Sequence, residues 1–163
     1  MVIDGLQFAR SSAELAGRID GARLTRLAGI PCHTKEVLFK VTGGINAGGK
    51  PALTVKLDGE LQLICQRCLT SLPFPLSVDT ELELSRSMEE IEGADDDIDR
   101  VLATREMNVE SLVEDEVILA LPMIPRHLHC ESLLSAKKSE SQVVKQASPF
   151  GVLASLRQRP GRR

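Results

Sequence analysis

The sequence predicts a single α+β domain, in which an antiparallel sheet packs with an N-terminal helix and a second helix near 109–121. Three segments, 36–42, 52–64 and 76–84, alternate apolar and polar residues with the period of two that marks a half-buried strand. Residues 108–121 instead repeat apolar side chains at helical spacing. The length of 163 residues fits one ordinary domain.

Residues 12–28 are predicted to form the N-terminal helix. Ser11 and Glu14 have the spacing of a capping box, in which a hydroxyl and a carboxylate satisfy the first turn. Leu15 and Ile19 follow at helical spacing. The two glycines of this segment oppose the prediction, because each costs about 1 kcal/mol relative to Ala inside a helix.

The strands are predicted to be joined by tight turns. The glycine-rich segment 43–49 follows the strand 36–42 and is expected to form a flexible hairpin loop. Asp58-Gly59 divides the run 52–64 and predicts a second hairpin there. Acidic residues alternate with the apolar ones in 76–84, so we expect one face of the sheet to contact water.

The helix near 109–121 is the most regular helical segment of the chain. Asn108 is a candidate N-cap, and Pro122 ends the helix. Carboxylates cluster in its first half, where the helix dipole favours negative charge. No nucleophile or second titrating partner stands near them in the sequence, so we interpret them as the polar face of a capped helix and not as an acid–base site.

The domain is predicted to cover residues 1–134, and residues 135–163 to form a flexible linker with a short apolar and basic C-terminal peptide. Inside the domain, residues 86–105 are rich in Asp and Glu and predict a flexible acidic loop. Within the C-terminal segment, residues 148–156 are apolar and arginines follow them. This peptide is expected either to dock on a partner or to pack back on the domain.

Charge is segregated along the chain, although the net charge is only −3. Residues 1–56 carry eight Lys or Arg against four Asp or Glu, residues 57–125 four against seventeen, and residues 126–163 eight against two. The acidic middle repels phosphate, whereas the basic ends attract it. With four Phe and neither Trp nor Tyr, the chain lacks the aromatic platforms that stack on single-stranded nucleic acid.

Neither a membrane segment nor a secretory signal is predicted. No apolar run reaches the roughly 18 residues of a transmembrane helix, and the N-terminus lacks a charged stretch followed by an apolar one. We therefore expect a cytoplasmic protein whose four cysteines are reduced. In that setting Cys-x-x-Cys is more often a metal or redox site than a structural disulfide.

Cys65 and Cys68 have the spacing of half a zinc knuckle, and His127 and Cys130 repeat the same offset. These four side chains are candidate ligands of one zinc ion that fastens the end of the domain to its middle. His129 is a poorer candidate, because adjacent residues converge on one ion with difficulty. Two alternatives remain open: reduced structural thiols, and thiol–disulfide chemistry, which favours Cys-x-x-Cys at a helix N-terminus.

Three segments of the chain together resemble the YceD family of large ribosomal RNA subunit accumulation proteins. They are Cys65-Gln66-Arg67-Cys68, residues 112–127, which read LVEDEVILALPMIPRH, and residues 148–156, which read SPFGVLASL. The resemblance implies a bacterial cytoplasmic protein, without enzymatic activity, that is needed for the synthesis, processing or stability of 23S ribosomal RNA.

We therefore expect a non-enzymatic factor in large ribosomal subunit biogenesis that binds ribosomal RNA or an early large-subunit assembly protein. The alternatives are a protein-interaction adaptor that does not contact RNA, and a thiol–disulfide redox protein. The candidate contacts of RNA or partner lie in the two basic ends of the chain. They are Arg18, Arg23, Arg26, Phe150, Leu153, Arg157 and Arg159.

Overall fold

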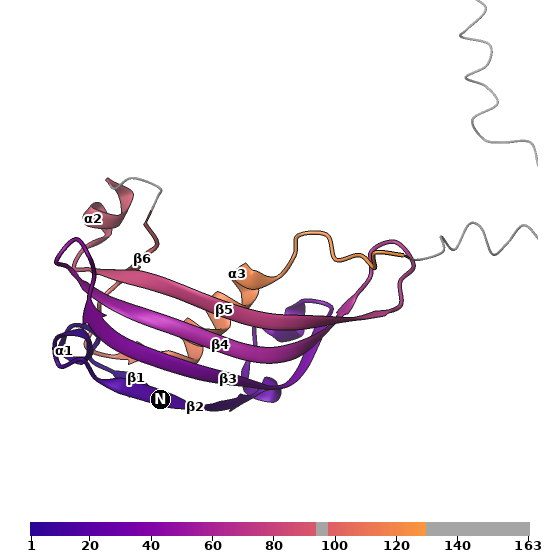
Figure 1. The fold of residues 1–163 in the computed structure, drawn as a ribbon, viewed down its shortest axis with the longest axis horizontal. Helices are drawn as coiled ribbons and strands as arrows, with labels where there is room; N and C mark the ends of the chain where they lie inside the picture. The colour runs from indigo at the N-terminus through magenta and orange to yellow at the C-terminus, as the bar shows by residue number, and fades with distance from the viewer. Residues whose placement is uncertain (94–97, 130–163) are drawn as a thin grey trace, which may run out of the picture. The chain divides into compact units, whose positions relative to one another are not determined.

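The computed structural model describes residues 1–93 and 98–129. The predicted α+β class is confirmed, with a five-stranded sheet in the order β2-β3-β4-β5-β6 and a two-stranded sheet of β1 and β7 (Figure 1). In chain order the elements are β1 (Val2–Ile3), α1 (Gly5–Arg10), β2 (Glu14–Asp20), the 3₁₀ turns η1 (Gly21–Arg23) and η2 (Leu27–Gly29), β3 (Cys32–Ile45), β4 (Pro51–Ile64), β5 (Ser71–Ser85), α2 (Met88–Glu92), β6 (Arg100–Leu102), β7 (Met107–Asn108) and α3 (Val109–Ala120).

The five-stranded sheet is antiparallel from β2 to β5, as predicted, and only β5 and β6 pair in parallel. Consecutive antiparallel strands need only tight turns, whereas a parallel pair needs a crossover, and the crossover between β5 and β6 contains α2. The β3–β4 turn and the β4–β5 turn therefore lie at opposite ends of the sheet, with α1 beside the first of them (Figure 1).

The helix predicted for residues 12–28 is wrong, because residues 14–20 form β2. Gly17 of β2 lies opposite Phe39 of β3, and a Cβ on this glycine would come within 3.1 Å of the aromatic ring. Glycine at this position leaves room for the large side chain on the neighbouring strand. The sequence spacing of apolar residues does not reveal such a neighbour. The N-terminal helix of the structure is α1, and the Asp4 side chain caps it by accepting a hydrogen bond from the N–H of Gln7 at 2.9 Å.

The hairpin predicted at Asp58-Gly59 is also wrong, because β4 continues through both residues. Gly59 pairs with Val37 of β3 on one side and with Leu76 of β5 on the other. A β-bulge in β3 just before Val37 brings the backbone close, so that a Cβ on Gly59 would lie 3.3 Å from the Glu36 carbonyl oxygen. The glycine therefore fits a bulge in the neighbouring strand, not a turn.

The glycine-rich segment 43–49 forms a hairpin loop only in its second half. Its first two glycines belong to β3, and the turn runs from Asn46 to Lys50. The N–H of Asn46 donates to the Lys50 carbonyl at 2.8 Å, and the N–H of Lys50 donates to the Asn46 side chain at 2.9 Å. Gly49 has a φ of 77°, which glycine adopts without steric cost.

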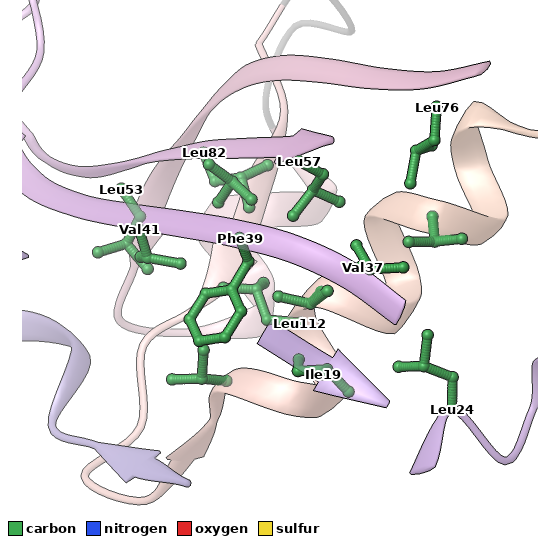
Figure 2. Close-up of a cluster of buried hydrophobic side chains, with 14 of the residues drawn as sticks. Ile19, Leu24, Val37, Phe39, Val41, Leu53, Leu57, Leu76, Leu82 and Leu112 are labelled. Carbon is green, nitrogen blue, oxygen red and sulfur yellow. The ribbon is translucent and has the colours of Figure 1, made fainter. Parts of the chain in front are cut away.

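One face of the sheet carries the hydrophobic core, and α3 and α1 cover that face. Alternate residues of the long strands are buried there, including Val37, Phe39, Val41, Leu53, Val55, Leu57, Leu61, Leu76 and Leu82. From α3 the core receives Val109, Leu112, Val113 and Val117. Figure 2 shows Leu112 among the sheet residues Ile19, Val37 and Phe39. Burying each such side chain contributes about 1.5–3 kcal/mol, so this helix is a major source of stability.

The second predicted helix is confirmed as α3. The Asn108 side-chain oxygen caps it by accepting a hydrogen bond from the N–H of Glu110 at 3.0 Å. The helix ends at Ala120, two residues before Pro122, which lacks the N–H that a further turn would require.

Arg26 fastens the loop before β3 to α3. The Glu114 carboxylate of α3 accepts the Arg26 side chain at 2.8 Å and the backbone N–H groups of Arg26 and Leu27 at 2.6 and 3.3 Å. Although burial opposes ionisation, these bonds hold the pKa of Glu114 below its usual value. Arg26 also pairs with Asp115 and donates to the Ser111 carbonyl at 2.9 Å. The acidic face of α3 therefore holds part of the fold in place.

A second ionised carboxylate, Glu83 of β5, joins the β3–β4 turn and β6 to the sheet. Lys50 and Arg100 donate to one of its oxygens at 2.7 and 2.9 Å, and Asn46 donates to the other at 3.0 Å. The hydrogen bonds from Lys50 and Arg100 are the main reason that the pKa of Glu83 falls to about 2. The side chains of Glu83 and Arg100 are both largely buried, so this ion pair is shielded from water, whereas Lys50 is 57% exposed.

The acidic loop predicted over 86–105 is partly regular structure. Residues 88–92 form α2, where the N–H of Glu90 donates to the Ser87 hydroxyl at 3.3 Å, and residues 100–102 form β6. A hydroxyl at the cap and carboxylates in the first turn stabilise even this short helix. The C-terminal linker and peptide predicted over 135–163 lie outside the described residues, so the domain boundary stays a prediction.

We predict that Arg26→Ala lowers the free energy of unfolding by about 2–3 kcal/mol, because the buried Glu114 carboxylate loses its charged partner. Urea unfolding followed by circular dichroism measures this change. Arg18→Ala is the matched control: Arg18 is exposed and lies 3.8 Å from its partner Glu36, so its loss should matter little. Equal losses in the two variants would contradict the role of Arg26.

We predict that Glu83→Gln lowers the free energy of unfolding by about 1–3 kcal/mol at pH 7, because Lys50 and Arg100 lose their shared anion. The pKa of Glu83 is depressed in the folded state, so its contribution is complete above the ordinary carboxyl pKa of 4.5 and disappears as the pH falls to about 2. The difference between wild type and variant should therefore shrink over that interval.

Unfolding curves of both proteins across this pH range test the prediction. Glu81→Gln serves as the control at pH 7, where replacing this exposed neighbour should not cause the loss. A difference between wild type and Glu83→Gln that stays constant down to pH 2 would contradict the assignment.

Candidate functional site

Cys65 and Cys68 lie in the turn between β4 and β5, at the end of the sheet that is remote from α1 (Figure 1). Two backbone hydrogen bonds close the turn: Cys65 N–H donates to the Thr70 carbonyl and Leu69 N–H to the Cys65 carbonyl, both at 2.9 Å. Leu69 has a φ of 59°, which is uncommon for a residue other than glycine. The turn buries both thiols: Cys65 is 0% exposed and Cys68 is 9% exposed.

The chain that leaves α3 runs to this turn. The N–H of Gln66 donates to the Pro125 carbonyl at 2.9 Å, which brings His127 beside the thiols. His127 Nδ1 lies 3.4 Å from Cys68 Sγ. The donor atoms of Cys65, Cys68 and His127 all lie within 4.8 Å of one another, and we call these three residues the cysteine–histidine cluster.

The cysteine–histidine cluster contains three of the four predicted zinc ligands. The fourth, Cys130, lies outside the described residues. His129, the poorer candidate, is exposed. Cys32 is buried in β3 and does not belong to the cluster. Residues 62 positions apart in the sequence are thus brought together, because the sheet and α3 place the end of the domain beside the β4–β5 turn.

The three cluster residues alter one another's ionisation. Burial opposes ionisation of Cys65, but the N–H groups of Cys68, His127 and Arg67, together with the Cys68 side chain, lower its pKa to about 5. The Thr70 hydroxyl, 3.1 Å from Cys68 Sγ, is the main cause of a lowered pKa at Cys68. Hydrogen bonds to Cys65 and Cys68 raise the pKa of His127. The site therefore favours the thiolate forms of Cys65 and Cys68 beside the imidazole ring of His127.

The local structure differs from that of thiol oxidoreductases, which place Cys-x-x-Cys at a helix N-terminus. Here the motif lies in a turn, and the chain after Cys68 enters β5. The backbone N–H groups of the turn take the place of a helix dipole in stabilising the thiolate. The redox alternative stays a prediction that this arrangement does not favour.

Two of the arginines predicted as RNA or partner contacts make ion pairs with α3. Arg23 pairs with Glu110, and Arg26 pairs with Glu114 and Asp115. Arg18 lies on β2 and is largely exposed. The remaining predicted contacts, Phe150, Leu153, Arg157 and Arg159, lie outside the described residues, so contact at all seven positions stays a prediction.

A pocket beside α1 is lined by three arginines that the sequence did not indicate. Arg10, Arg86 and Arg105 are all exposed, and we call this feature the arginine pocket. Asp4 also lines the pocket, but its carboxylate already accepts the hydrogen bond that caps α1. Among the residues that the structure describes, none of the three arginines has a carboxylate partner in an ion pair. They come from α1 and from the two ends of the acidic segment, and only the fold brings them together.

Large apolar side chains are exposed from the last turn of α3 to the residue after His127. Leu119 is 77% exposed, Met123 98% and Leu128 95%. Single exposed apolar residues are ordinary, but several large ones within a short segment are typical of a surface that meets another macromolecule.

The fold and these surfaces define a small α+β protein with a buried Cys-x-x-Cys/His cluster at one end of its sheet and a basic pocket at the other. No helix among residues 1–93 and 98–129 is long and apolar enough to cross a membrane. No solved structure matches the chain.

The chain belongs to the YceD family, because the family described as "Large ribosomal RNA subunit accumulation protein YceD" matches residues 53–157. The protein of that name from Haemophilus influenzae is 28% identical over 176 residues, which cover 98% of this chain and 96% of the relative. The predicted family resemblance is thereby confirmed. The matched residues include the cysteine–histidine cluster and two arginines of the pocket, Arg86 and Arg105.

Proposed function

We propose that the protein is a non-enzymatic factor in large ribosomal subunit biogenesis that supports the synthesis, processing or stability of 23S rRNA in the bacterial cytoplasm. The observation that carries this proposal is the match of residues 53–157 to a family named for accumulation of large-subunit ribosomal RNA. Its partner is ribosomal RNA or an early large-subunit assembly protein.

The arginine pocket supports direct contact with RNA. A guanidinium group offers a planar fork of donors that binds phosphate in bidentate fashion, and phosphate contacts dominate the affinity of most proteins for nucleic acid. Arg10, Arg86 and Arg105 place three such groups around one hollow. A phosphate of the RNA backbone would therefore meet several donors at once.

Several other basic residues of the domain are less suited to this contact, because carboxylates neutralise them. On the outer face of the sheet, Lys40 lies 2.9 Å from Glu14 and Lys56 lies 2.7 Å from Asp79. A paired charge adds little to the field that attracts phosphate. The eight Lys and Arg of residues 126–163 form the second basic region, and they favour a contact through the C-terminal segment.

Two of the α3 carboxylates have a structural use that explains their presence without catalysis. Glu110 and Glu114 each bind an arginine from the loop before β3. The hydrogen bonds from Arg26 lower the pKa of Glu114, which makes this carboxylate a poor general base because its affinity for a proton is reduced. These residues are therefore better explained as structural anchors.

We predict that depletion of the protein lowers 23S rRNA relative to 16S rRNA and leaves 23S precursor ends unprocessed. The physical reason is that large-subunit RNA without its assembly factor stays accessible to nucleases. Quantitative electrophoresis and primer extension measure both. An unchanged ratio together with normal precursor ends would refute the proposed function.

We predict that replacing Arg10, Arg86 and Arg105 together by Ala weakens binding to purified 23S precursor RNA about tenfold at physiological salt. Losing three phosphate contacts should also reduce the slope of log K against log salt by about 2–3. Filter binding over a salt series measures both quantities.

The matched control replaces Lys35, Lys40 and Lys56 by Ala. It also removes three positive charges, but from the outer face of the sheet. An equal loss in the two variants would indicate a general effect of net charge and would contradict a contact at the arginine pocket.

The second candidate function is a protein-interaction adaptor that does not contact RNA. The exposure of Leu119, Met123 and Leu128 favours it. Crosslinking in cells separates the two functions, because an RNA-binding factor is recovered with 23S precursor, whereas an adaptor is recovered with protein alone.

A further inference from the structure

We propose that Cys65, Cys68 and His127 bind one zinc ion, which fastens the chain after α3 to the β4–β5 turn. The first argument is convergence. Three donor atoms from two distant segments lie within 4.8 Å of one another, so a single ion can reach all of them. This site is independent of the role in ribosome biogenesis, because it concerns how the domain is held together.

The spacing of the donor atoms fits a tetrahedral zinc site. With Zn–S near 2.3 Å and Zn–N near 2.0 Å, tetrahedral geometry places a sulfur and a nitrogen ligand about 3.5 Å apart. Cys68 Sγ and His127 Nδ1 are separated by 3.4 Å. Two sulfurs and one imidazole nitrogen form a soft donor set, which selects zinc over the oxygen-seeking ions calcium and magnesium.

A second shell already orients the ligands. His127 Nε2 lies 3.1 Å from the Ser71 carbonyl, so this nitrogen carries the hydrogen and donates it. In the neutral ring Nδ1 is then the nitrogen with the lone pair, and it is the one that faces Cys68; zinc would displace the proton that Nδ1 otherwise shares with the thiolates. Metal-binding histidines characteristically donate their other N–H to a carbonyl or carboxylate in this way. The Thr70 hydroxyl, 3.1 Å from Cys68 Sγ, stabilises the thiolate similarly.

The site also has a structural reason to exist. The chain from Leu121 to His129 forms neither helix nor strand, and individual hydrogen bonds hold it to the rest of the domain, among them Gln66 N–H to the Pro125 carbonyl and His127 Nε2 to the Ser71 carbonyl. A metal bridge would add a stronger link between this segment and the β4–β5 turn.

The test is the metal content of the full-length protein, purified without chelators and measured by elemental analysis. We expect about one zinc per chain in wild type, and loss of that zinc in Cys65→Ser, Cys68→Ser and His127→Gln. Cys32→Ala and His33→Gln are matched controls outside the cluster, and they should retain the zinc. Wild-type protein that is folded and metal-free after exposure to zinc would overturn the proposal, as would zinc that persists in the three ligand variants.

A second measurement on wild type keeps the test valid if the ligand variants do not fold. Cobalt substitution should give the thiolate-to-cobalt charge-transfer band and the intense ligand-field bands of a tetrahedral site. Removal of zinc by a strong chelator should lower the melting temperature, and added zinc should restore it. Octahedral cobalt spectra or a melting temperature indifferent to chelator would overturn the proposal. Neither readout depends on ribosomal RNA.

Discussion

The packing of α3 on the inner face of the five-stranded sheet is the contact on which the rest of the structure depends. A sheet with one apolar face requires another element to cover it, and α3 contributes Val109, Leu112, Val113 and Val117 to that cover. The ends and the polar side of the same helix then position three other segments. Its cap lies beside the β1–β7 pair, Glu114 holds the loop before β3, and its C-terminal end directs the chain toward the β4–β5 turn. One helix therefore stabilises the core and places His127 beside the cysteines.

Part of the segregated charge is paired inside the fold. Basic residues of the N-terminal third bind acidic residues of the middle: arginines from the loop before β3 bind carboxylates of α3, and Lys50 binds Glu83. The positive charge that an external partner can contact is that of the basic residues without a carboxylate neighbour. Among the described residues the arginine pocket is the clearest group of this kind. A charge balance counted along a chain therefore overstates the field that a partner meets.

Periodicity predicted the long strands and α3, because tertiary packing there acts on the same apolar faces that the sequence displays. Two errors came from glycines. Gly17 and Gly59 sit where a ring or a bulged strand approaches the backbone, and that reason depends on a neighbour far away in sequence. The alternation of Leu57 and Leu61 keeps its phase across Gly59, a signal that favours one continuous strand. The spacing of cysteines and histidines predicted a set of metal ligands, and the structure brings three of them, Cys65, Cys68 and His127, together. No local pattern in the sequence joins Arg10 to Arg86 and Arg105.

The pairing of β1 with β7 has a consequence for the order in which the chain folds. It brings Met1 to Glu110, 109 positions away, while the β2–β5 meander pairs only sequence neighbours. Local pairings form first, because closing a long loop carries a larger entropy loss. At translation rates of about 5–20 residues per second, α3 is completed roughly 2–7 s after β5. During that interval the nascent meander exposes its apolar face. The form of this protein most prone to aggregate is therefore an incomplete sheet that is still attached to the ribosome.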